Sequence, residues 1–367
     1  MIWLDWLKIS YERKQYRYRY CRLVIMTEKE LCLRLCEIDG TAGDEKEIAK
    51  KAQDILSQYM KTEIDTLGNV VAKFNEDGKI KIVLEAHMDR VGLVIRGIDE
   101  KGFLLIDKVG GTDARTLIGA NVVVFGGERI PGVICSTPPH LMKKGDEDSP
   151  VDVTKLAIDI GLSKEKAQQL VSIGDRAVIE SKGVELLDDR ISSAALDDRA
   201  GMASVIIAVE NVIKRLKNVS LTVVFSTQEE VGGSGAKTAA FNFDADYAIC
   251  VDVGFGGDLL CDRTQTIDLE KGASIGISPV LDRAFMIELK ETAKKHGIPF
   301  QHDVMAGRTG TNADNICNSK GGVKTALLSI PLRNMHTPVE VISTKDIKLT
   351  ADLISAFILE KEEQYNA

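Results

Sequence analysis

The sequence predicts an α/β protein with a mostly parallel sheet flanked by helices and an inserted small β-barrel domain. Strand-like and helical patterns alternate over residues 26–92 and 187–367, and this alternation is typical of a parallel sheet. Between them, over residues 93–186, short β-type runs are separated by glycine-rich turns, as in a small barrel or sandwich. The 367 residues, 44% of them hydrophobic, are enough to bury the cores of two domains.

The first 25 residues are aromatic and basic where the rest of the chain is neither. They do not fit a secretion signal, because Asp5 and Lys8 interrupt the apolar part and the positive charges follow it. The segment is also too short to span a membrane. We expect an atypical leader that is disordered or results from a mis-assigned start, so that the domain begins near Met26. The alternative is an arm that binds a membrane surface or a partner.

The first α/β segment is expected to contain two helices followed by strands. The run at 81–86 is apolar enough to be a central strand, and it ends just before His87 and Asp89. The inserted segment has one short helix, after Ser163. The expected elements are helices at 27–38 and 44–59, strands at 63–74 and 81–86, and β-type runs at 94–98, 103–106, 122–125, 133–135 and 177–180.

The second α/β segment returns to alternating helices and strands. Asp197 and Asp198 open a long helix that is expected to run to residue 217, and Gly297 closes a later one. An amphipathic helix is expected near the end of the chain. These elements are strands at 221–227, 247–253 and 325–330, and helices at 197–217, 282–296 and 344–362.

Two adjacent carboxylates, Glu229 and Glu230, follow the apolar, β-branched run at 220–226. A buried strand would bring both to one site, where they would repel each other unless a positive charge lies nearby. Successive residues of an extended strand point in opposite directions, so the strand must break at this pair, and Gly232 and Gly233 supply the freedom. The candidate positive charge is a metal ion.

Further acids and histidines occur at the carboxyl ends of the other expected strands, where open α/β sheets bind ligands. Singly, each has a structural interpretation, such as a helix cap. Together they form a mixed nitrogen and oxygen donor set that suits zinc, cobalt or manganese. They suffice for two ions bridged by a carboxylate, with one glutamate left as a base. The set is His87, Asp89, Asp197, Asp198, Glu229, Glu230, Asp252 and His336.

These residues lie in motifs that follow one another as A-H-M-D-R-V-G, L-D-D-R-A-G, Q-E-E-V-G, V-D-V and M-H-T-P. The ordered set resembles the dinuclear metallo-aminopeptidases that form tetrahedral particles. This family includes glutamyl and leucyl aminopeptidases and was formerly often labelled endoglucanase or cellulase. The resemblance extends from Met26 to the C-terminus. It implies a zinc-exopeptidase-like fold, hydrolysis of N-terminal residues from short peptides, and twelve subunits associated through the inserted β-domain.

By matching positions, the resemblance also implies the role of each residue. Glu229 is the general base. Asp89 accepts the other N–H of the His87 imidazole and fixes its tautomer, as metal-bound histidines generally require. The implied ligands of the two ions, zinc or cobalt, are His87, Asp197, Glu230, Asp252 and His336, with Asp197 bridging.

Two positions depart from the family pattern. Arg90 stands where many relatives carry an acidic residue, and Asn312 stands where many carry aspartate. We therefore expect a difference in the recognition of the substrate amine or of the N-terminal side chain. Arg308 is a candidate for favouring acidic side chains, with a plain surface role as its alternative.

Two other functions are open. A glycosidase could use Glu229 and Glu230, but its carboxyl groups must lie about 5 to 9.5 Å apart across the scissile bond, which neighbouring residues rarely achieve. The two histidines would also have no task. A non-catalytic assembly that only binds metal is the other alternative, and the complete ligand set with an intact Glu229 argues against it.

The net charge of −8 leaves no basic stripe beyond the leader, which argues against nucleic-acid binding. Seven cysteines form no regular framework, and without a secretion signal they indicate reduced thiols in the cytoplasm. The expected partners are short peptides and further copies of the chain, and neither nucleic acid nor membrane.

Overall fold

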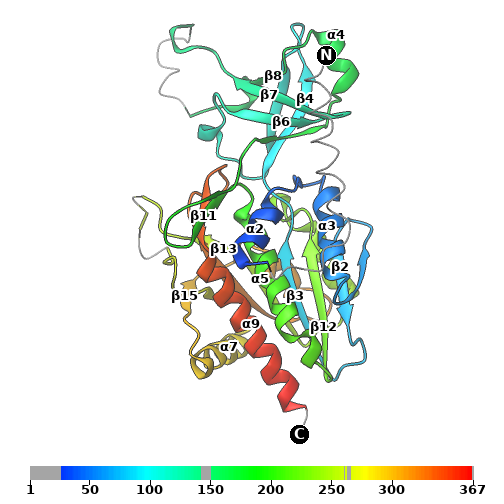
Figure 1. The fold of residues 1–367 in the computed structure, drawn as a ribbon, viewed down its shortest axis with the longest axis vertical. Helices are drawn as coiled ribbons and strands as arrows, with labels where there is room; N and C mark the ends of the chain where they lie inside the picture. Colours follow the sequence, from blue (N-terminus) through cyan, green and yellow to red (C-terminus); the bar gives the residue numbers. More distant parts are fainter. Residues whose placement is uncertain (1–25, 142–149, 260, 263–265, 366–367) are drawn as a thin grey trace, which may run out of the picture.

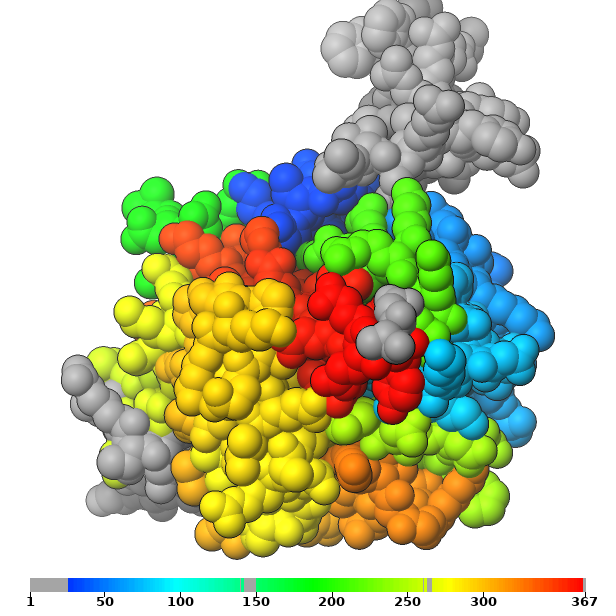
Figure 2. All heavy atoms as spheres, turned by 90° about the horizontal axis from the view of Figure 1, so that it is seen from below, coloured from blue at the N-terminus to red at the C-terminus, as the bar shows by residue number. Residues whose placement is uncertain are grey.

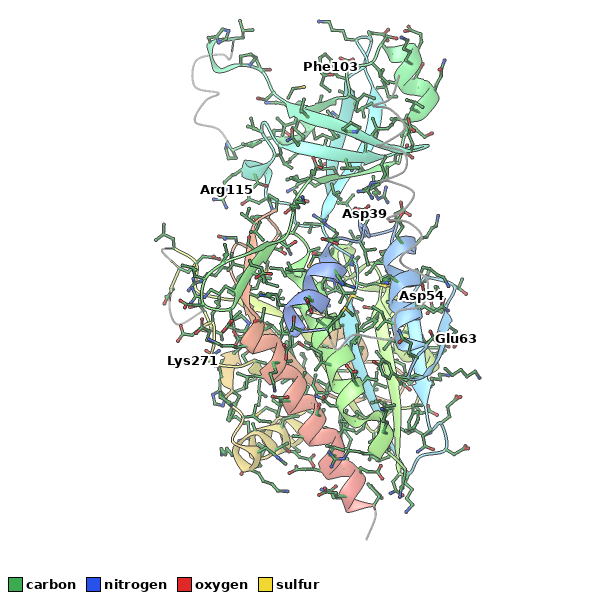
Figure 3. All side chains as sticks on the ribbon, in the orientation of Figure 1. Asp39, Asp54, Glu63, Phe103, Arg115 and Lys271 are labelled. Carbon is green, nitrogen blue, oxygen red and sulfur yellow. The ribbon has the colours of Figure 1, made fainter. Side chains whose placement is uncertain are left out.

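The computed structural model describes residues 26–141, 150–259, 261–262 and 266–365, and it consists of two bodies stacked along the long axis (Figure 1). The lower body is a layered α/β structure and the upper body is a β-barrel. Asp39, labelled near the junction in Figure 3, forms an ion pair with Arg129 of the barrel. The expected leader, residues 1–25, lies outside the described residues.

An eight-stranded sheet forms the centre of the lower body. Its four middle strands, β12, β3, β13 and β16, are parallel, whereas β2 and β14 on either side of them are antiparallel to their inner neighbours. The sheet is thus parallel where it is most deeply buried, as predicted. In spatial order the strands are β1 (Lys61–Ile64), β2 (Val70–Phe74), β12 (Val219–Ser226), β3 (Ile80–His87), β13 (Tyr247–Phe255), β16 (Lys324–Leu332), β14 (Ser274–Ile277) and β15 (Gln301–Val304).

Helices cover both faces of this sheet. Five of the described α-helices pack on one face, where the principal core lies, and two pack on the other. Figure 2 shows the end of α9 in red beside α7 in gold. The first group is α2 (Glu28–Cys36), α3 (Lys46–Leu56), α5 (Leu196–Val212), α7 (Arg283–His296) and α9 (Thr344–Gln364), and the second is α6 (Ser234–Asn242) and α8 (Ala313–Ile316). No helix in the described part of the chain has the length and apolar composition needed to cross a bilayer.

The upper body is a closed six-stranded barrel with its own apolar core. Five of its strands fall on the β-type runs read from the sequence, and α4 (Lys164–Leu170) follows Ser163 as expected. The sixth strand, β8, was not predicted because it has only three residues. Around the barrel the strands are β4 (Gly92–Ile98), β5 (Leu104–Val109), β8 (Ala157–Asp159), β7 (Arg129–Cys135), β6 (Asn121–Phe125) and β9 (Arg176–Ile179).

The long helix expected from residue 197 begins later than predicted. Asp197 (φ −80°, ψ 104°) and Asp198 (φ −119°, ψ 43°) have non-helical backbones, the peptide bond between them is cis, and regular helix starts at Arg199. The helix also ends at Val212, followed by a 3₁₀ turn, η6 (Ile213–Arg215). Asp197 therefore stands in front of the helix, where its side chain can reach a site, whereas Asp198 Oδ1 accepts the backbone N–H of Gly201 at 2.9 Å and caps the helix, the structural role considered for it.

A small third sheet, which the sequence did not reveal, connects two segments that are far apart in the chain. It consists of β10 (Val184–Glu185), β11 (Arg190–Ser193) and β17 (Glu340–Ser343), all antiparallel. Strand β11 leads directly to Asp197, and β17 follows His336 by a few residues. The pairing of β11 with β17 thus brings the segments next to Asp197 and His336 close together.

Candidate metal centre

The acids and histidines singled out in the sequence meet at the carboxyl ends of the parallel strands. His87 is the last residue of β3 and Asp252 lies in β13. Glu230 follows β12, and His336 follows β16. Because these four strands are neighbours in the sheet, their ends deliver the side chains to one place, where Asp197 reaches in from the start of α5.

The side chains form two groups that share Asp197. His87 Nε2 lies 2.9 Å from Asp197 Oδ1 and 3.8 Å from Asp252 Oδ1. In the second group, His336 Nε2 lies 3.3 Å from Asp197 Oδ2 and 3.4 Å from Glu230 Oε2. Within each group the ligand atoms all lie within 4.8 Å of one another. Asp197 therefore offers one carboxylate oxygen to each group.

The buried carboxylates of the two ligand groups provide negative charge that divalent cations could neutralise. Burial and the negative charge of Asp197 raise the pKa of Asp252 and of Glu230 well above their usual range. Glu230 Oε1 is buried and lacks a hydrogen-bond partner among the described residues. A carboxylate and imidazole donor set of this kind is suited to zinc, cobalt or manganese. Buried acids gathered in this way require either protons or cations, and the paired geometry favours cations.

Hydrogen bonds between Asp197 and the two histidines shift the pKa values of these groups. Burial alone would lower the pKa of His87, but its hydrogen bond with Asp197 raises that pKa well above the usual range. Burial raises the pKa of Asp197, yet the hydrogen bonds with His336 and His87 outweigh this effect and hold that pKa below its usual range. Asp197 is therefore the anionic centre around which both groups are arranged.

The strand does break at the glutamate pair, as predicted. Glu229 and Glu230 lie in a 3₁₀ turn, η7 (Glu229–Val231), preceded by Gln228 in the left-handed region at φ 59°. Gly232 and Gly233 follow with φ of 118° and 72°, values that non-glycine residues rarely adopt. We call residues 227–233 the glutamate elbow.

Buried side chains bind the successive backbone N–H groups of the glutamate elbow. Asn69 Oδ1 accepts from Thr227 at 2.9 Å, and Glu45 Oε1 accepts from Gln228 at 3.2 Å. The Asp89 carboxylate accepts the next two, from Glu229 at 3.0 Å and from Glu230 at 3.1 Å. These anchors replace the ladder hydrogen bonds that end with β12. Asn69 and Glu45 were missed, because nothing in a loop asparagine or in a glutamate just before a helix signals a contact so far along the chain.

The contacts of Asp89 differ in part from those expected, and its role toward His87 stays a prediction. His87 Nδ1 faces the backbone carbonyl of Asp89 at 3.1 Å, whereas the nearer carboxylate oxygen is 3.6 Å away, beyond hydrogen-bond distance. A carbonyl at Nδ1 still fixes the imidazole tautomer with Nε2 toward the metal groups. The carboxylate is instead engaged with the glutamate elbow, because two N–H donors lie closer to it.

Glu229 belongs to neither ligand group but lines the same cleft. Burial raises the pKa of Glu229 to about 7, with His87 opposing and Asp197 and Asp89 reinforcing the shift. The cleft has a volume of about 1130 Å³, and Asp197, Glu230, Asp252 and His336 also line it. A carboxylate beside the ligand groups, open to a cleft of that size, is placed to exchange protons with water or substrate there.

Arg90 and Asn312 do not form part of the cleft wall in the described structure. Arg90 is buried behind the centre, in a cavity of about 20 Å³. The Asn312 amide donates to Glu85 at 2.8 Å and to Ser226 at 2.9 Å beneath the sheet end. The expectation that these two residues alter substrate recognition through direct contact is therefore not supported.

Arg308 does line the cleft, but it is not a free cation there. Its guanidinium Nε lies 3.3 Å from Asp314 Oδ2, and its side chain is 80% exposed. Asp314 in turn accepts hydrogen bonds from Thr309 and Gly310. The pairing connects Arg308 to its own loop, and together with the high exposure of its side chain it favours the surface alternative stated for it.

A glycine pair in the segment after β5 packs against the second ligand group. A Cβ atom on Gly111 would lie 2.5 Å from His336 Nδ1, and one on Gly110 would lie 3.2 Å from the Cβ of Glu230. Gly110 also has a left-handed backbone, with φ 73°. The barrel segment thus touches the candidate ligands at a point where only glycine fits.

We therefore expect Gly111→Ala to displace the His336 imidazole and to reduce turnover about 100-fold, the cost of a shift of about 1 Å at a reacting centre. Gly321→Ala is the matched control, because no atom lies within 4 Å of the added Cβ and its φ is unexceptional. Rates of peptide hydrolysis, the activity that the resemblance implies, and thermal midpoints of both variants check this. Equal rates for the two variants would contradict the contact.

Comparisons with known proteins give a consistent picture. A family model described as M42 glutamyl aminopeptidase matches residues 68–353. A putative aminopeptidase of Acetivibrio thermocellus is 34% identical, over 89% of this chain and 96% of its own length. A lysyl aminopeptidase of Pyrococcus furiosus is 32% identical, over 91% and 98% respectively.

Solved structures are similar over nearly the whole fold. The TET1 peptidase of Pyrococcus horikoshii, which can assemble into a tetrahedron or a large octahedral shell, is 32% identical, with a TM-score of 0.80 over 90% of this chain and 98% of that one. The structure of PhTET1-12s, a dodecamer, has the same identity and coverage and a TM-score of 0.81.

Proposed function

Because this chain belongs to the M42 glutamyl aminopeptidase family, and is therefore a peptide hydrolase, we propose that it removes N-terminal residues from short peptides with two divalent metal ions. One observation carries the proposal. The two ligand groups share Asp197, and each uses a different oxygen of that carboxylate. A shared carboxylate is the arrangement that holds two ions close enough to act together.

We assign His87 and Asp252 to the first ion, Glu230 and His336 to the second, and Asp197 to both. The nitrogen and oxygen donors suit zinc or cobalt, which we propose as the native metals. When bound, the ions would supply Lewis-acid polarisation of the scissile carbonyl and acidify the attacking water. Proton transfer is assigned to a side chain of the protein.

Glu229 is the proposed general base. It takes one proton from the attacking water, whose oxygen forms a bond to the scissile carbonyl carbon. As the C–N bond breaks, Glu229 returns that proton to the departing amine nitrogen, so the peptide and the water are consumed and an amino acid and a shorter peptide are formed. Asp89 holds the backbone of Glu229, so that its side chain stays directed toward the cleft.

The glycosidase alternative finds no support in the site. Glu229 and Glu230 occupy one 3₁₀ turn, and Glu230 lies with His336 and Asp197 in a ligand group. An acid pair for glycoside hydrolysis needs two opposed carboxyl groups about 5 to 9.5 Å apart, with a sugar between them. A purely metal-binding assembly is likewise disfavoured, because Glu229 is placed at the cleft without serving as a ligand in either group.

We also propose a division of labour along the chain. Residues 26–92 and 187–367 form the catalytic domain, and residues 93–186 serve as an oligomerisation domain. The similar PhTET1-12s structure is a dodecamer, which supports a dodecamer here. A cytoplasmic location is supported by the six cysteines of the described residues, which are all free thiols.

The proposed function is tested with amino-acid anilides and short peptides, assayed with added Zn²⁺ or Co²⁺, before and after chelation. We expect release of the N-terminal residue only with metal present, and recovery when metal is returned. Peptides with an acetylated N-terminus serve as controls and should not be cleaved. Activity that persists after complete metal removal would refute the proposal.

A further inference from the structure

A buried carboxylate that the sequence did not single out lies directly behind the second ligand group. Glu340, the first residue of β17, is only 2% exposed. Its Oε1 accepts the backbone N–H of His336 at 2.9 Å, and its Oε2 accepts the backbone N–H of Asp197 at 3.3 Å. One side chain thus binds the backbone of two candidate metal ligands that come from distant parts of the chain.

Neither of these two backbones is held by regular secondary structure. His336 has a left-handed backbone, with φ 61°, and Asp197 precedes the regular part of α5. A left-handed backbone is unfavourable for a residue other than glycine, so it persists only where its surroundings fix it. The two oxygens of Glu340 replace the backbone acceptors that a helix or strand would provide.

Glu340 lies near other acids, but a positively charged side chain lies near it as well. Arg90 is buried, and it lines the same cavity of about 20 Å³ as Glu340, Asp197, Glu230 and His336. Burial and the negative charge of Asp197 raise the pKa of Glu340 well above its usual range, while its two backbone hydrogen bonds and the positive charge of Arg90 oppose this rise. The two backbone N–H donors and the nearby Arg90 are thus the groups that favour the ionised form of this buried carboxylate.

We infer that Glu340 is a positioning residue, which sets the distance between the bridging Asp197 carboxylate and the His336 imidazole and thereby fixes the geometry of the second ion. The inference rests on the proposed function only in taking these two residues as metal ligands. Glu340 has no contact with substrate in this scheme and acts solely through the backbone N–H groups it binds.

The test compares Glu340→Ala and Glu340→Gln with the unaltered protein. Metal affinity is measured by titrating metal-free protein with Co²⁺ against a competing chromophoric chelator, together with the visible absorption spectrum of the bound Co²⁺. We expect Glu340→Ala to bind the second ion about 10- to 100-fold more weakly, with a changed spectrum, because supporting groups behind metal ligands contribute on this scale. Glu340→Gln should be intermediate, since its amide oxygen can accept from only one of the two N–H groups.

Asp346→Ala is the matched control. Asp346 is equally buried and also accepts two backbone N–H groups, from Glu270 at 2.7 Å and Gly272 at 2.8 Å, but both lie outside the ligand groups. We expect this variant to melt at a lower temperature and yet bind both ions with unchanged affinity. If it loses affinity as much as Glu340→Ala does, the effect of Glu340 is general destabilisation and the inference is wrong.

Two further outcomes are decisive. Unchanged affinity for both ions in Glu340→Ala, or in Glu340→Gln if the alanine variant does not fold, would overturn the inference. The binding isotherms do not depend on catalysis, so an unaltered protein that binds two ions but cleaves no peptide would refute the proposed function while the role of Glu340 could still be judged. Peptide cleavage together with normal metal binding in the Glu340 variants would refute the role of Glu340 and leave the proposed function standing.

Discussion

Glu229→Gln is expected to retain both metal ions and to lose peptide hydrolysis, with kcat reduced at least 100-fold and up to about 10,000-fold, the usual contribution of a general base. The glutamine has the same shape but cannot accept the proton of the attacking water. Because the Asp89 carboxylate binds the backbone N–H of Glu229 and not its side chain, the glutamate elbow should keep its conformation. Metal content by elemental analysis and steady-state kinetics on a peptide substrate check this.

The contrasting variant is the same substitution one residue further along. Glu230→Gln should weaken binding of the second ion, because Glu230 Oε2 lies in the ligand group with His336 and Asp197. The two variants thus separate proton transfer from metal binding at adjacent positions. Normal turnover in Glu229→Gln would remove Glu229 from the mechanism.

Asp197→Ala is expected to abolish tight binding of both ions, whereas His336→Ala should affect mainly the second. The reason is geometric, since Asp197 gives one oxygen to each ligand group and His336 belongs to only one. Peptidase activity should fall below detection in Asp197→Ala. Metal stoichiometry per subunit, measured at several free metal concentrations, distinguishes the two outcomes.

Metal binding should also be visible in stability. An ion at 100 times its Kd stabilises the folded state by about 2.7 kcal/mol, so adding metal should raise the thermal midpoint of the unaltered protein. The same addition should leave the midpoint of Asp197→Ala nearly unchanged. A variant that still binds one ion tightly would show that the bridging assignment is wrong.

Much of the site could be predicted because its acidic and histidine side chains lie at the ends of strands. An apolar run that stops at His87 or at Glu229 is visible in the sequence, and parallel neighbours must place such residues at the same edge. The ordered motifs then narrowed the function to one family, which the comparisons confirm. The closed barrel was likewise predictable, since glycine-rich turns separate its strands.

The supporting residues could not be predicted, for a physical reason. Asn69, Glu45 and Glu340 act by binding backbone N–H groups of distant segments, and a backbone N–H has no sequence signature. Strands β14 and β15, the last two at one end of the sheet, have four residues each, too few for a pattern to stand out. Their pairing depends on the rest of the sheet being in place.

The glycine pair at residues 110 and 111 couples the barrel domain to the second ligand group. The segment that follows β5 packs directly against His336 and Glu230. The inserted domain and the second ligand group are therefore in van der Waals contact at that point. A side chain added at residue 110 or 111 would press on a ligand residue of the second group. A change in this part of the barrel domain would therefore reach the metal site through contact alone, with every residue of the two ligand groups left unaltered.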